Sequence, residues 1–424
     1  MHFILTGLGS YGDVLPIAGL AATLVERGHR VQLAASPYFR EVVAATGAEL
    51  IELGTVDDYL GLVNDPRLWH PTRGFHVVYG YTAKTLSALY RTLAAHSIPG
   101  ETIHAAHGID FASRLLQERF GNPLATVHFA PIALCSVEDL PAFIGSPPAW
   151  ALPRWARGGW SWAADRLGLD RLTGPPLNAL RSELGLSPVK RVFTSWASSP
   201  TRIVALFPEW FSSDPGDWSP QVRQVGFPLY DAATDARMSE EGEAFLSAGE
   251  PPIVFAPGSA NAQAKEFFAA AAQACRLLDR RGMLVTKYAE QLPPSLPAGV
   301  ERFGFVPFSR LLPRAAAIVH HGGIGTCGQS LAAGIPQVVT PLGFDQLDNG
   351  RRLERLGVAA IVPSKRTSAR RLAAALGPLI SSEAVRSRCR DLAGRCNGVA
   401  SRIAACDLLE QLARPEAPVP QPDI

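Results

Sequence analysis

The sequence predicts an α/β fold made of two doubly wound, Rossmann-like domains. Two stretches, one starting at residue 1 and the other at residue 251, each predict a strand, a helix and a second strand in succession. A third stretch, from residue 315, predicts a strand, a glycine-rich turn and a helix. The chain of 424 residues is long for one hydrophobic core and suits two domains of about 200 residues each.

The first βαβ unit is the run MHFILTGLGSYGDVLPIAGLAATLVERGHRVQLAAS. It predicts a buried strand, a glycine loop, an amphipathic helix opened by Pro16 and closed at Gly28, and another strand. The glycine spacing is not G-x-G-x-x-G followed by an acidic ribose ligand, so a nicotinamide- or flavin-dependent oxidoreductase receives little support.

A polar, turn-rich connection, GFPLYDAATDARMSEEGEAF, sets the expected domain limits. We expect a first domain over residues 1–228 and a second over residues 229–402. The second domain opens with strand PPIVFA, helix AKEFFAAAAQACRLLDRR and strand MLVTK, which repeat the βαβ pattern. Residues 403–424 are expected to form a final helix and a tail.

The most informative run extends from His320 to Asn349 and reads HHGGIGTCGQSLAAGIPQVVTPLGFDQLDN. Its glycines allow a sharp backbone turn close to a ligand, and the helix that follows directs unpaired N–H groups and a positive dipole end at that ligand. This arrangement predicts an anion site. A purely structural turn is the alternative, since glycine-rich strand-to-helix turns occur in many α/β proteins.

The same run continues through strand PQVVTP to Asp345 and Gln346, two side chains that together can bracket vicinal hydroxyls. A phosphate site followed by a hydroxyl-binding pair predicts a nucleotide-sugar site.

The run resembles the donor-binding signature of GT-B glycosyltransferases of family 1, especially the bacterial branch with an HHGGxGT core. The resemblance implies two such domains facing across a cleft, with the nucleotide sugar as co-substrate and no cofactor or metal. It also implies that Asp345 and Gln346 hold donor-sugar hydroxyls. The implied phosphate site consists of His321, Gly323, Gly325 and Thr326.

Three further donor contacts are implied by position in the family pattern. Gln329 stands where UDP-dependent members often carry a glutamate that grips the ribose, so UDP and dTDP both remain open. Phe305 and Val306 match the base-stacking segment, although a buried core phenylalanine is the alternative. Gly258 and Ser259, at the carboxyl end of a predicted strand, match a second donor-contacting turn, with a plain loop as the alternative.

The GDVxP segment near the amino terminus also resembles this family and implies that Asp13 is the general base. A nucleoside diphosphate donor needs the incoming hydroxyl deprotonated on one side and the departing phosphates stabilised on the other. Asp13 as a loop or helix-cap residue is the alternative. His107 is the nearest equivalent of the acid that orients the base in relatives, with Asp110 close by; a polar strand end without catalytic duty is the alternative.

The segment PAFIGSPPAWALPRWARGGWSW predicts the acceptor region, since Trp150, Trp155 and Trp160 could line an apolar pocket or touch a lipid surface. Ordinary packing of a loop on the core is the alternative. Within the family, DPRLWHPTRGF, KRVFTSWASSP and VGFPL resemble the rhamnosyltransferase branch of mono-rhamnolipid synthesis, which implies a hydrophobic hydroxylated acceptor. The resemblance also implies that the last helix crosses back to the first domain.

Composition excludes some classes of protein. The balance of 40 basic and 38 acidic residues argues against a nucleic-acid binder. Six cysteines without CxxC spacing predict a reducing compartment and no structural metal. The first strand follows no leader, and no apolar run approaches the roughly 20 residues of a membrane span, so we expect a cytoplasmic protein, at most peripheral to the inner membrane.

These observations predict an inverting, metal-independent glycosyltransferase that moves glucose or rhamnose from a UDP- or dTDP-sugar to a hydroxyl of a lipid or small natural product. A nucleotide-sugar 2-epimerase of the same fold is one alternative, but it would want further acidic residues in the cleft. A noncatalytic nucleotide-sugar binding subunit is another, against which the presence of both Asp13 and His321 argues.

Overall fold

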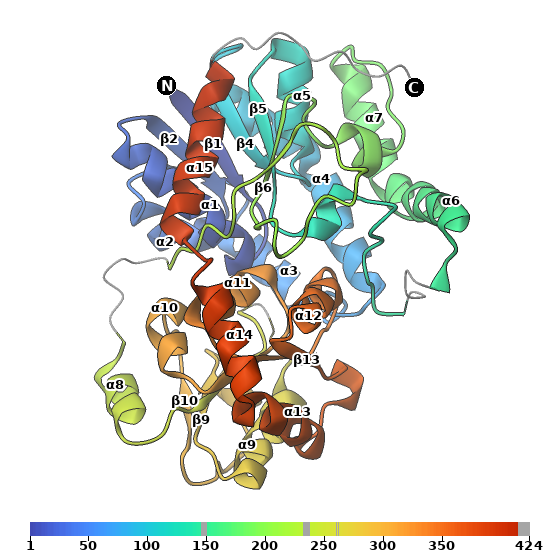
Figure 1. Ribbon diagram of the computed structural model, residues 1–424. Coiled ribbons are helices and arrows are strands. Elements are labelled where there is room, and N and C mark those ends of the chain that lie inside the picture. The colour runs from blue at the N-terminus through green and yellow to red at the C-terminus, as the bar shows by residue number, and fades with distance from the viewer. Residues whose placement is uncertain (146–150, 232–237, 260, 262, 414–424) are drawn as a thin grey trace.

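The computed structural model describes residues 1–145, 151–231, 238–259, 261 and 263–413 (Figure 1). Two parallel β-sheets, one in each half of the molecule, form the centres of two α/β units. The predicted fold class is confirmed.

The first sheet is seven-stranded and has the order β3-β2-β1-β4-β5-β6-β7. Alternate residues of its central strand enter different cores, as the two-residue period of a strand requires. Phe3 and Leu5 pack with α1, whereas Ile4 packs with α4, α5 and α7 on the other face. The strands are β1 (His2–Gly7), β2 (Arg30–Ala35), β3 (Glu49–Glu52), β4 (Ile103–His107), β5 (Leu124–His128), β6 (Arg202–Ala205) and β7 (Val222–Gln224).

The second sheet is six-stranded and has the order β10-β9-β8-β11-β12-β13. Its strand β8 divides its side chains in the same way, with Ile253 and Phe255 facing α9 and α13, and Val254 facing α8 and α10. The strands are β8 (Ile253–Ala256), β9 (Gly282–Val285), β10 (Val300–Phe303), β11 (Ala317–His320), β12 (Gln337–Val339) and β13 (Ala359–Ile361).

Helices cover both faces of each sheet. In the first unit they are α1 (Tyr11–Glu26), α2 (Arg40–Ala44), α3 (Val56–Val63), α4 (Arg73–His96), α5 (Phe111–Phe120), α6 (Arg154–Ala164) and α7 (Asp170–Glu183), with π-helical turns at Asp165–Leu169 and Val192–Trp196. After it come α8 (Glu240–Ser247), α9 (Lys265–Leu278), α10 (Phe308–Leu311), α11 (Ile324–Ala333), α12 (Gln346–Arg355), α13 (Ala369–Ser381), α14 (Glu383–Ala393) and α15 (Gly398–Glu410).

The start of α1 corrects the sequence analysis. The helix begins at Tyr11, so Pro16 lies inside it rather than opening it. Ser10 is the N-cap and forms a capping box with Asp13, which satisfies amides that would otherwise lack partners. The helix ends as predicted beside Gly28, which has a left-handed φ of 81°.

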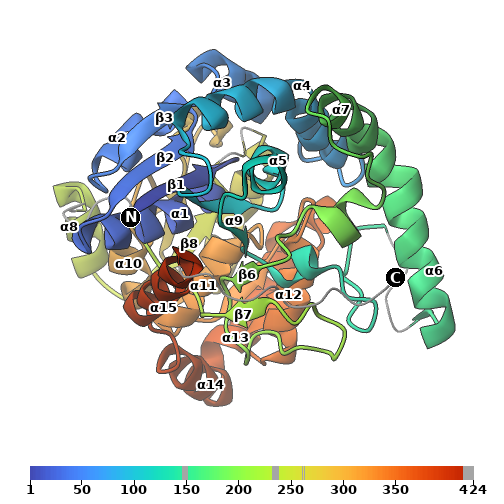
Figure 2. The ribbon, with the colours of Figure 1, turned by 90° about the horizontal axis from the view of Figure 1, so that it is seen from above.

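The last helix returns to the first unit. Both views place α15 along α1 (Figures 1 and 2). Arg27 at the end of α1 pairs with Asp407 at 2.8 Å and Glu410 at 2.9 Å, and His29 also contacts Glu410 at 2.9 Å. The tail predicted beyond this helix lies outside the described residues.

The strand orders explain where ligands would bind. Each order reverses direction between two central strands, β1 and β4 in the first sheet and β8 and β11 in the second. At such a reversal the connections leave on opposite faces, and a crevice opens beyond the carboxyl ends of the strands. In the first sheet, Asp13 comes after β1 and His107 is the last residue of β4. In the second sheet, Gly258 comes after β8 and His321 after β11. No described helix is long and apolar enough to cross a membrane.

Candidate active site

A cavity of about 1690 Å³ lies between the two units and confirms that they face each other across a cleft. Its walls come from the segments after β1, β4 and β5 of the first sheet and after β8, β9, β10 and β11 of the second. The cavity has a predicted donor end at the second sheet and an apolar end along α4 in the first unit.

His321 stands at the centre of the donor end, immediately after β11. A Cβ atom added at Gly258 would come within 3.1–3.2 Å of its ring, and one at Gly323 within 2.5 Å of Nε2, so both flanking glycines are needed for the ring to lie where it does. Burial lowers the pKa of His321 to about 4. The imidazole is therefore neutral at pH 7 and can donate one hydrogen bond, while a bound anion would raise its pKa.

The neighbouring His320 has a structural role instead. It is fully buried, its Nε2 lies 3.0 Å from Gln337 Oε1, and its Nδ1 accepts the N–H of Gly322 at 3.1 Å. Gly322 has a left-handed φ of 97°, and a Cβ there would lie 2.7 Å from the carbonyl oxygen of Gln346. Of the two adjacent histidines, His320 therefore belongs to the core and His321 to the wall of the cavity.

The amino end of α11 has the geometry that the predicted anion site requires. Gly323 is the N-cap and supplies no capping side chain, so the first-turn amides have no partner within the helix. Gly323, Gly325 and Thr326 all line the cavity. The helix ends at Ala333, and its C-cap Gly334 is in a left-handed conformation with φ 69°.

Phe305 lies just beyond β10 and is 67% exposed, so it is not the core residue that formed the alternative interpretation. Its ring lines the cavity opposite Tyr11 of the first unit, with ring centroids 6.5 Å apart. The adjacent Val306 is buried but also borders the cavity, as do Gly258 and Ser259. An exposed ring at this place is available for stacking on a nucleobase.

Gln329 is already engaged by a residue that the sequence analysis missed. Its Nε2 donates to Oδ1 of Asp231 at 3.1 Å, and Oδ2 of Asp231 accepts the N–H of Ser309 at 2.9 Å. Asp231 and Gln329 both line the cavity. The donor end therefore carries a carboxylate beside the neutral amide; Asp231 lies 98 residues before Gln329 in the sequence, so no local motif reveals it.

Asp345 and Gln346 open α12 and both border the cavity. Oδ2 of Asp345 accepts a hydrogen bond from Asn349 at 2.7 Å, and burial, with a smaller effect from the charge of Asp13, raises its pKa to about 6. Oε1 of Gln346 accepts the N–H groups of Leu342 at 2.7 Å and Gly343 at 3.2 Å. The side-chain oxygen of Gln346 is therefore bonded to the loop that precedes α12. Its amide nitrogen remains available to donate a hydrogen bond to a ligand.

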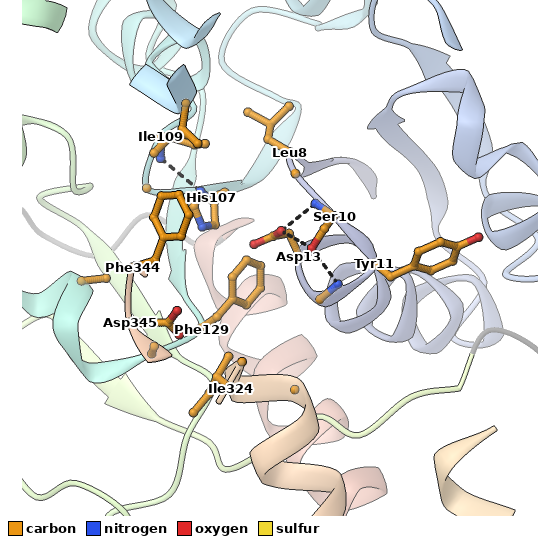
Figure 3. Close-up of a pocket in the computed structure, with 18 of the residues that line it drawn as sticks. Leu8, Ser10, Tyr11, Asp13, His107, Ile109, Phe129, Ile324, Phe344 and Asp345 are labelled. Atoms are coloured by element: carbon orange, nitrogen blue, oxygen red, sulfur yellow. Dashed lines mark hydrogen bonds between the residues drawn. The ribbon is translucent and has the colours of Figure 1, made fainter. Parts of the chain in front are cut away.

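Asp13 faces this pair from the first unit. Its Oδ2 accepts hydrogen bonds from the backbone N–H of Ser10 at 2.7 Å and from the Ser10 hydroxyl at 3.1 Å. Burial raises its pKa to about 6. Figure 3 shows its carboxyl group directed into the space bordered by His107, Phe129 and Asp345. Asp13 therefore helps to cap α1, as in the alternative interpretation, and it also lines the cavity.

No hydrogen bond joins Asp13 to His107, although both are described and both line the cavity (Figure 3). The ring of His107 stacks on Phe129 at 5.0 Å, and its Nδ1 accepts the N–H of Ile109 at 3.3 Å. Burial lowers its pKa to about 4. Asp110 caps α5, since its Oδ1 accepts the N–H of Ser113 at 3.0 Å; it does not line the cavity.

The apolar end is built by aromatic side chains from several segments. Phe75 and Tyr79 lie one turn apart on α4 with parallel rings 6.1 Å apart, and Phe193 of the second π-helical turn packs edge-on against Tyr79 at 4.8 Å. The ring of Phe344, the residue before Asp345, lies 5.2 Å from that of Phe75. No sequence motif predicts a role for any of these residues.

Of the tryptophans predicted to bind the acceptor, Trp160 lines the cavity and is 44% exposed. Trp155 is 86% exposed and is not among the lining residues, because α6 directs it, with Trp162 seven residues later, away from the cavity. This observation opposes the acceptor contact predicted for Trp155. Trp150 lies outside the described residues.

Comparisons with known proteins agree with this geometry. Residues 281–403 match a family model described as the C-terminal domain of proteins like erythromycin biosynthesis protein CIII. The chain is 29% identical to the O-mycaminosyltylonolide 6-deoxyallosyltransferase of Streptomyces fradiae, with 97% of this chain and 98% of the relative aligned. It is 28% identical to glycosyltransferase GtfC of Amycolatopsis orientalis, with 99% and 100% aligned.

Solved structures share the whole fold. The glycotransferase of kitacinnamycin superposes with a TM-score of 0.74 at 21% identity, covering 97% of this chain and 99% of the other. The spinosyn rhamnosyltransferase SpnG, solved with thymidine diphosphate, gives a TM-score of 0.65 at 18% identity, covering 97% and 100%. Its complex with the spinosyn aglycone gives 0.66 at 16% identity, with the same coverage. The fold is therefore GT-B.

Proposed function

We propose that this chain, which has the GT-B fold, is a glycosyltransferase related to family 1. The proposed enzyme is an inverting, metal-independent hexosyltransferase with Asp13 as its general base. One observation carries this proposal: a carboxyl group with a pKa of about 6 and a neutral histidine at a helix amino end border the same cavity from opposite units. Residues 1–228 would hold the acceptor and residues 229–402 the donor.

The donor end suits a nucleoside diphosphate leaving group. As the bond between the anomeric carbon and the phosphate oxygen breaks, negative charge develops on the diphosphate. The first-turn amides of α11, the N–H of His321 and the hydroxyl of Thr326 can donate hydrogen bonds to that charge. These donors supply the charge stabilisation for which other transferases employ a metal ion.

The acceptor hydroxyl would attack from the side of the first unit. Asp13 takes its proton as the oxygen bonds to the anomeric carbon, and a single displacement inverts the configuration at that carbon. A carboxyl group with a pKa of about 6 is a stronger base than an exposed aspartate and is still mostly ionised at pH 7. His107 is proposed as a residue that borders the acceptor hydroxyl, since it lines the same cavity as Asp13 and does not hydrogen-bond to it (Figure 3).

For the sugar, we propose that Asp345 and the amide nitrogen of Gln346 contact hexose hydroxyls of glucose or rhamnose. For the nucleotide, the solved relative that holds thymidine diphosphate supports dTDP, and UDP is the other candidate. Asp231, held by Gln329, is placed to accept hydrogen bonds from the ribose side of either nucleotide.

The proposed acceptor is a hydrophobic hydroxylated natural product or lipid. The aromatic walls of the apolar end support this class, because they offer large apolar area with few polar groups. The resemblance to the rhamnolipid branch favours a lipid, and the exposed Trp155 and Trp162 on α6 would then suit a peripheral membrane contact.

The proposal is tested with a panel of UDP, dTDP and their hexoses in a thermal-shift assay, followed by assays of nucleoside diphosphate release with and without hydrophobic alcohols. A ligand that binds only the folded state raises its stability, so one nucleotide series should stabilise the protein selectively. Release should then accelerate when an accepted alcohol is added. Absence of binding by every nucleotide sugar would refute the proposal.

A nucleotide-sugar 2-epimerase is the second candidate, because several carboxyl groups line the cavity, and Asp13 and Asp345 among them have raised pKa values. Incubation of the donor without acceptor in deuterated water separates the two. An epimerase would return a nucleotide sugar with changed configuration, whereas a transferase would give only slow hydrolysis.

A further inference from the structure

Helix α12 links the sugar-binding end of the cavity to its apolar end. Asp345 is its N-cap, and Asp348 and Arg352 follow at spacings of three and four residues. Residues at these spacings share one face of a helix, so the three side chains form a single row. Asp345 borders the cavity. Asp348 and Arg352, which form an ion pair, continue the row away from the cavity lining.

Arg352 joins three separate segments although only 4% of its surface is exposed. Its Nε donates to Asp348 Oδ2 at 2.8 Å, its Nη1 to Ser212 Oγ at 2.7 Å, and its Nη2 to Asp139 Oδ2 at 2.8 Å. Burial opposes the charge of the guanidinium, but the two carboxylates outweigh it and raise its pKa. Ser212 and Asp139 belong to the first unit, so the network crosses the boundary between units.

The segment Asp139–Ile144 is held by this network at two points. Arg352 binds Asp139, and Oδ1 of Asp348 accepts the N–H of Ala142 at 3.1 Å. Between and beyond these points, the apolar side chains face the cavity; they are Leu140, Pro141, Phe143 and Ile144. Phe143 also packs edge-on against Phe75 of α4 at 5.8 Å.

We propose that Arg352 and Asp139 are acceptor-positioning residues. Their ion pair fixes one apolar wall of the cavity relative to the helix that starts at Asp345, so that the acceptor hydroxyl meets the donor sugar in register. This inference rests on the proposed function. Neither residue lines the cavity, so both act through the segment that they hold.

A purely structural role would predict a different pattern, and the chain offers a matched comparison. Arg27 binds Asp407 and Glu410, and this network likewise ties a late helix to the first unit. None of these three residues lines the cavity. Breaking either network should lower the melting temperature, but only the network at Arg352 should change acceptor binding.

The test compares Asp139→Ala and Asp139→Asn with the control Glu410→Ala. We expect Asp139→Ala to raise the KM for the acceptor about tenfold, as for the loss of a hydrogen bond between charged groups. The KM for the donor and donor hydrolysis without acceptor should stay within about twofold of wild type. Asp139→Asn keeps an acceptor oxygen for Arg352 and should fall between wild type and Asp139→Ala.

Arg352→Lys gives a second variant, because one ammonium group cannot reproduce three bonds from a planar fork. It should reproduce the split between acceptor and donor KM. Hydrogen exchange supplies a readout that needs no turnover. The amides of residues 139, 140 and 142–144 should exchange faster in Asp139→Ala than in wild type, and at an unchanged rate in Glu410→Ala.

The inference is overturned if Asp139→Ala leaves the acceptor KM and the exchange of residues 139–144 unchanged, or if acceptor and donor KM rise together. Failure of the proposed function is separate, since it would appear in the wild-type protein as an absence of transfer. In that case the exchange data alone decide whether the network holds the segment.

Discussion

The two ends of the cavity are built by different means. At the predicted donor end, the backbone conformation determines the shape of the wall. Gly258 and Gly322 have left-handed φ values, and Gly323 caps α11 while leaving room for His321. At the apolar end, side chains determine the shape of the wall. They come from α4, the second π-helical turn and the segment Asp139–Ile144.

This difference teaches which part of the site is free to change. A substitution at Gly322 meets backbone and core atoms at 2.7 Å, so the cradle tolerates little variation. Phe75, Tyr79 and Phe193 can be exchanged for other apolar residues with smaller strain, because side chains alone define that wall. The proposed function therefore predicts a donor site that tolerates less variation than the acceptor site.

The largest effect is expected at the point where the two ends meet. Asp13→Asn should lower kcat by about 100- to 10,000-fold, the usual contribution of a general base. Nucleotide affinity should change little, because the amide oxygen of asparagine can still accept the N–H of Ser10 and preserve the start of α1. Rapid-quench kinetics and calorimetry measure the two quantities; turnover near the wild-type rate would remove Asp13 from the mechanism.

At the donor end, His321→Ala should weaken nucleoside diphosphate binding by about 1–3 kcal/mol, or about 5- to 150-fold, since a buried hydrogen bond to an anion is lost. Its effect on the apolar end should be small. Calorimetric titration with dTDP and UDP tests this, and the KM for the acceptor serves as the internal control. Equal nucleotide affinity in wild type and variant would show that the phosphates bind elsewhere.

The pH dependence of kcat/KM should report the base. Burial raises the pKa of Asp13 to about 6, and only its ionised form accepts a proton. Activity should therefore fall about tenfold per pH unit below pH 6 and level off above it. Asp345 has a pKa in the same range, so the profile of Asp345→Asn is the control: the acidic limb should persist there. Loss of the limb in that variant would assign it to Asp345 instead.

The contrast between the two ends also explains what the sequence could predict. The cradle lies within one run of residues whose glycines are required by local backbone geometry, so strand, turn, helix and His321 were all predicted in place. Asp231 was missed because its contact with Gln329 arises only through folding. The start of α1 at Tyr11 was missed because Pro16, which favours the first turn of a helix, was taken as the start. Ser10 and Asp13 form the actual cap. The aromatic wall was missed because its residues come from distant segments.

The smallest predicted effect separates two tryptophans on one helix. Trp160 lines the cavity, whereas Trp155 is 86% exposed and directed away from it. Trp160→Ser should raise the acceptor KM a fewfold, since a partly exposed ring contributes about 1 kcal/mol of apolar contact. Trp155→Ser should leave transfer to a dissolved acceptor unchanged, while weakening any binding to lipid vesicles. If Trp155→Ser alone raised the KM for a dissolved acceptor, the acceptor would bind across the outer face of α6, and the division between the two ends of the cavity would have to be redrawn.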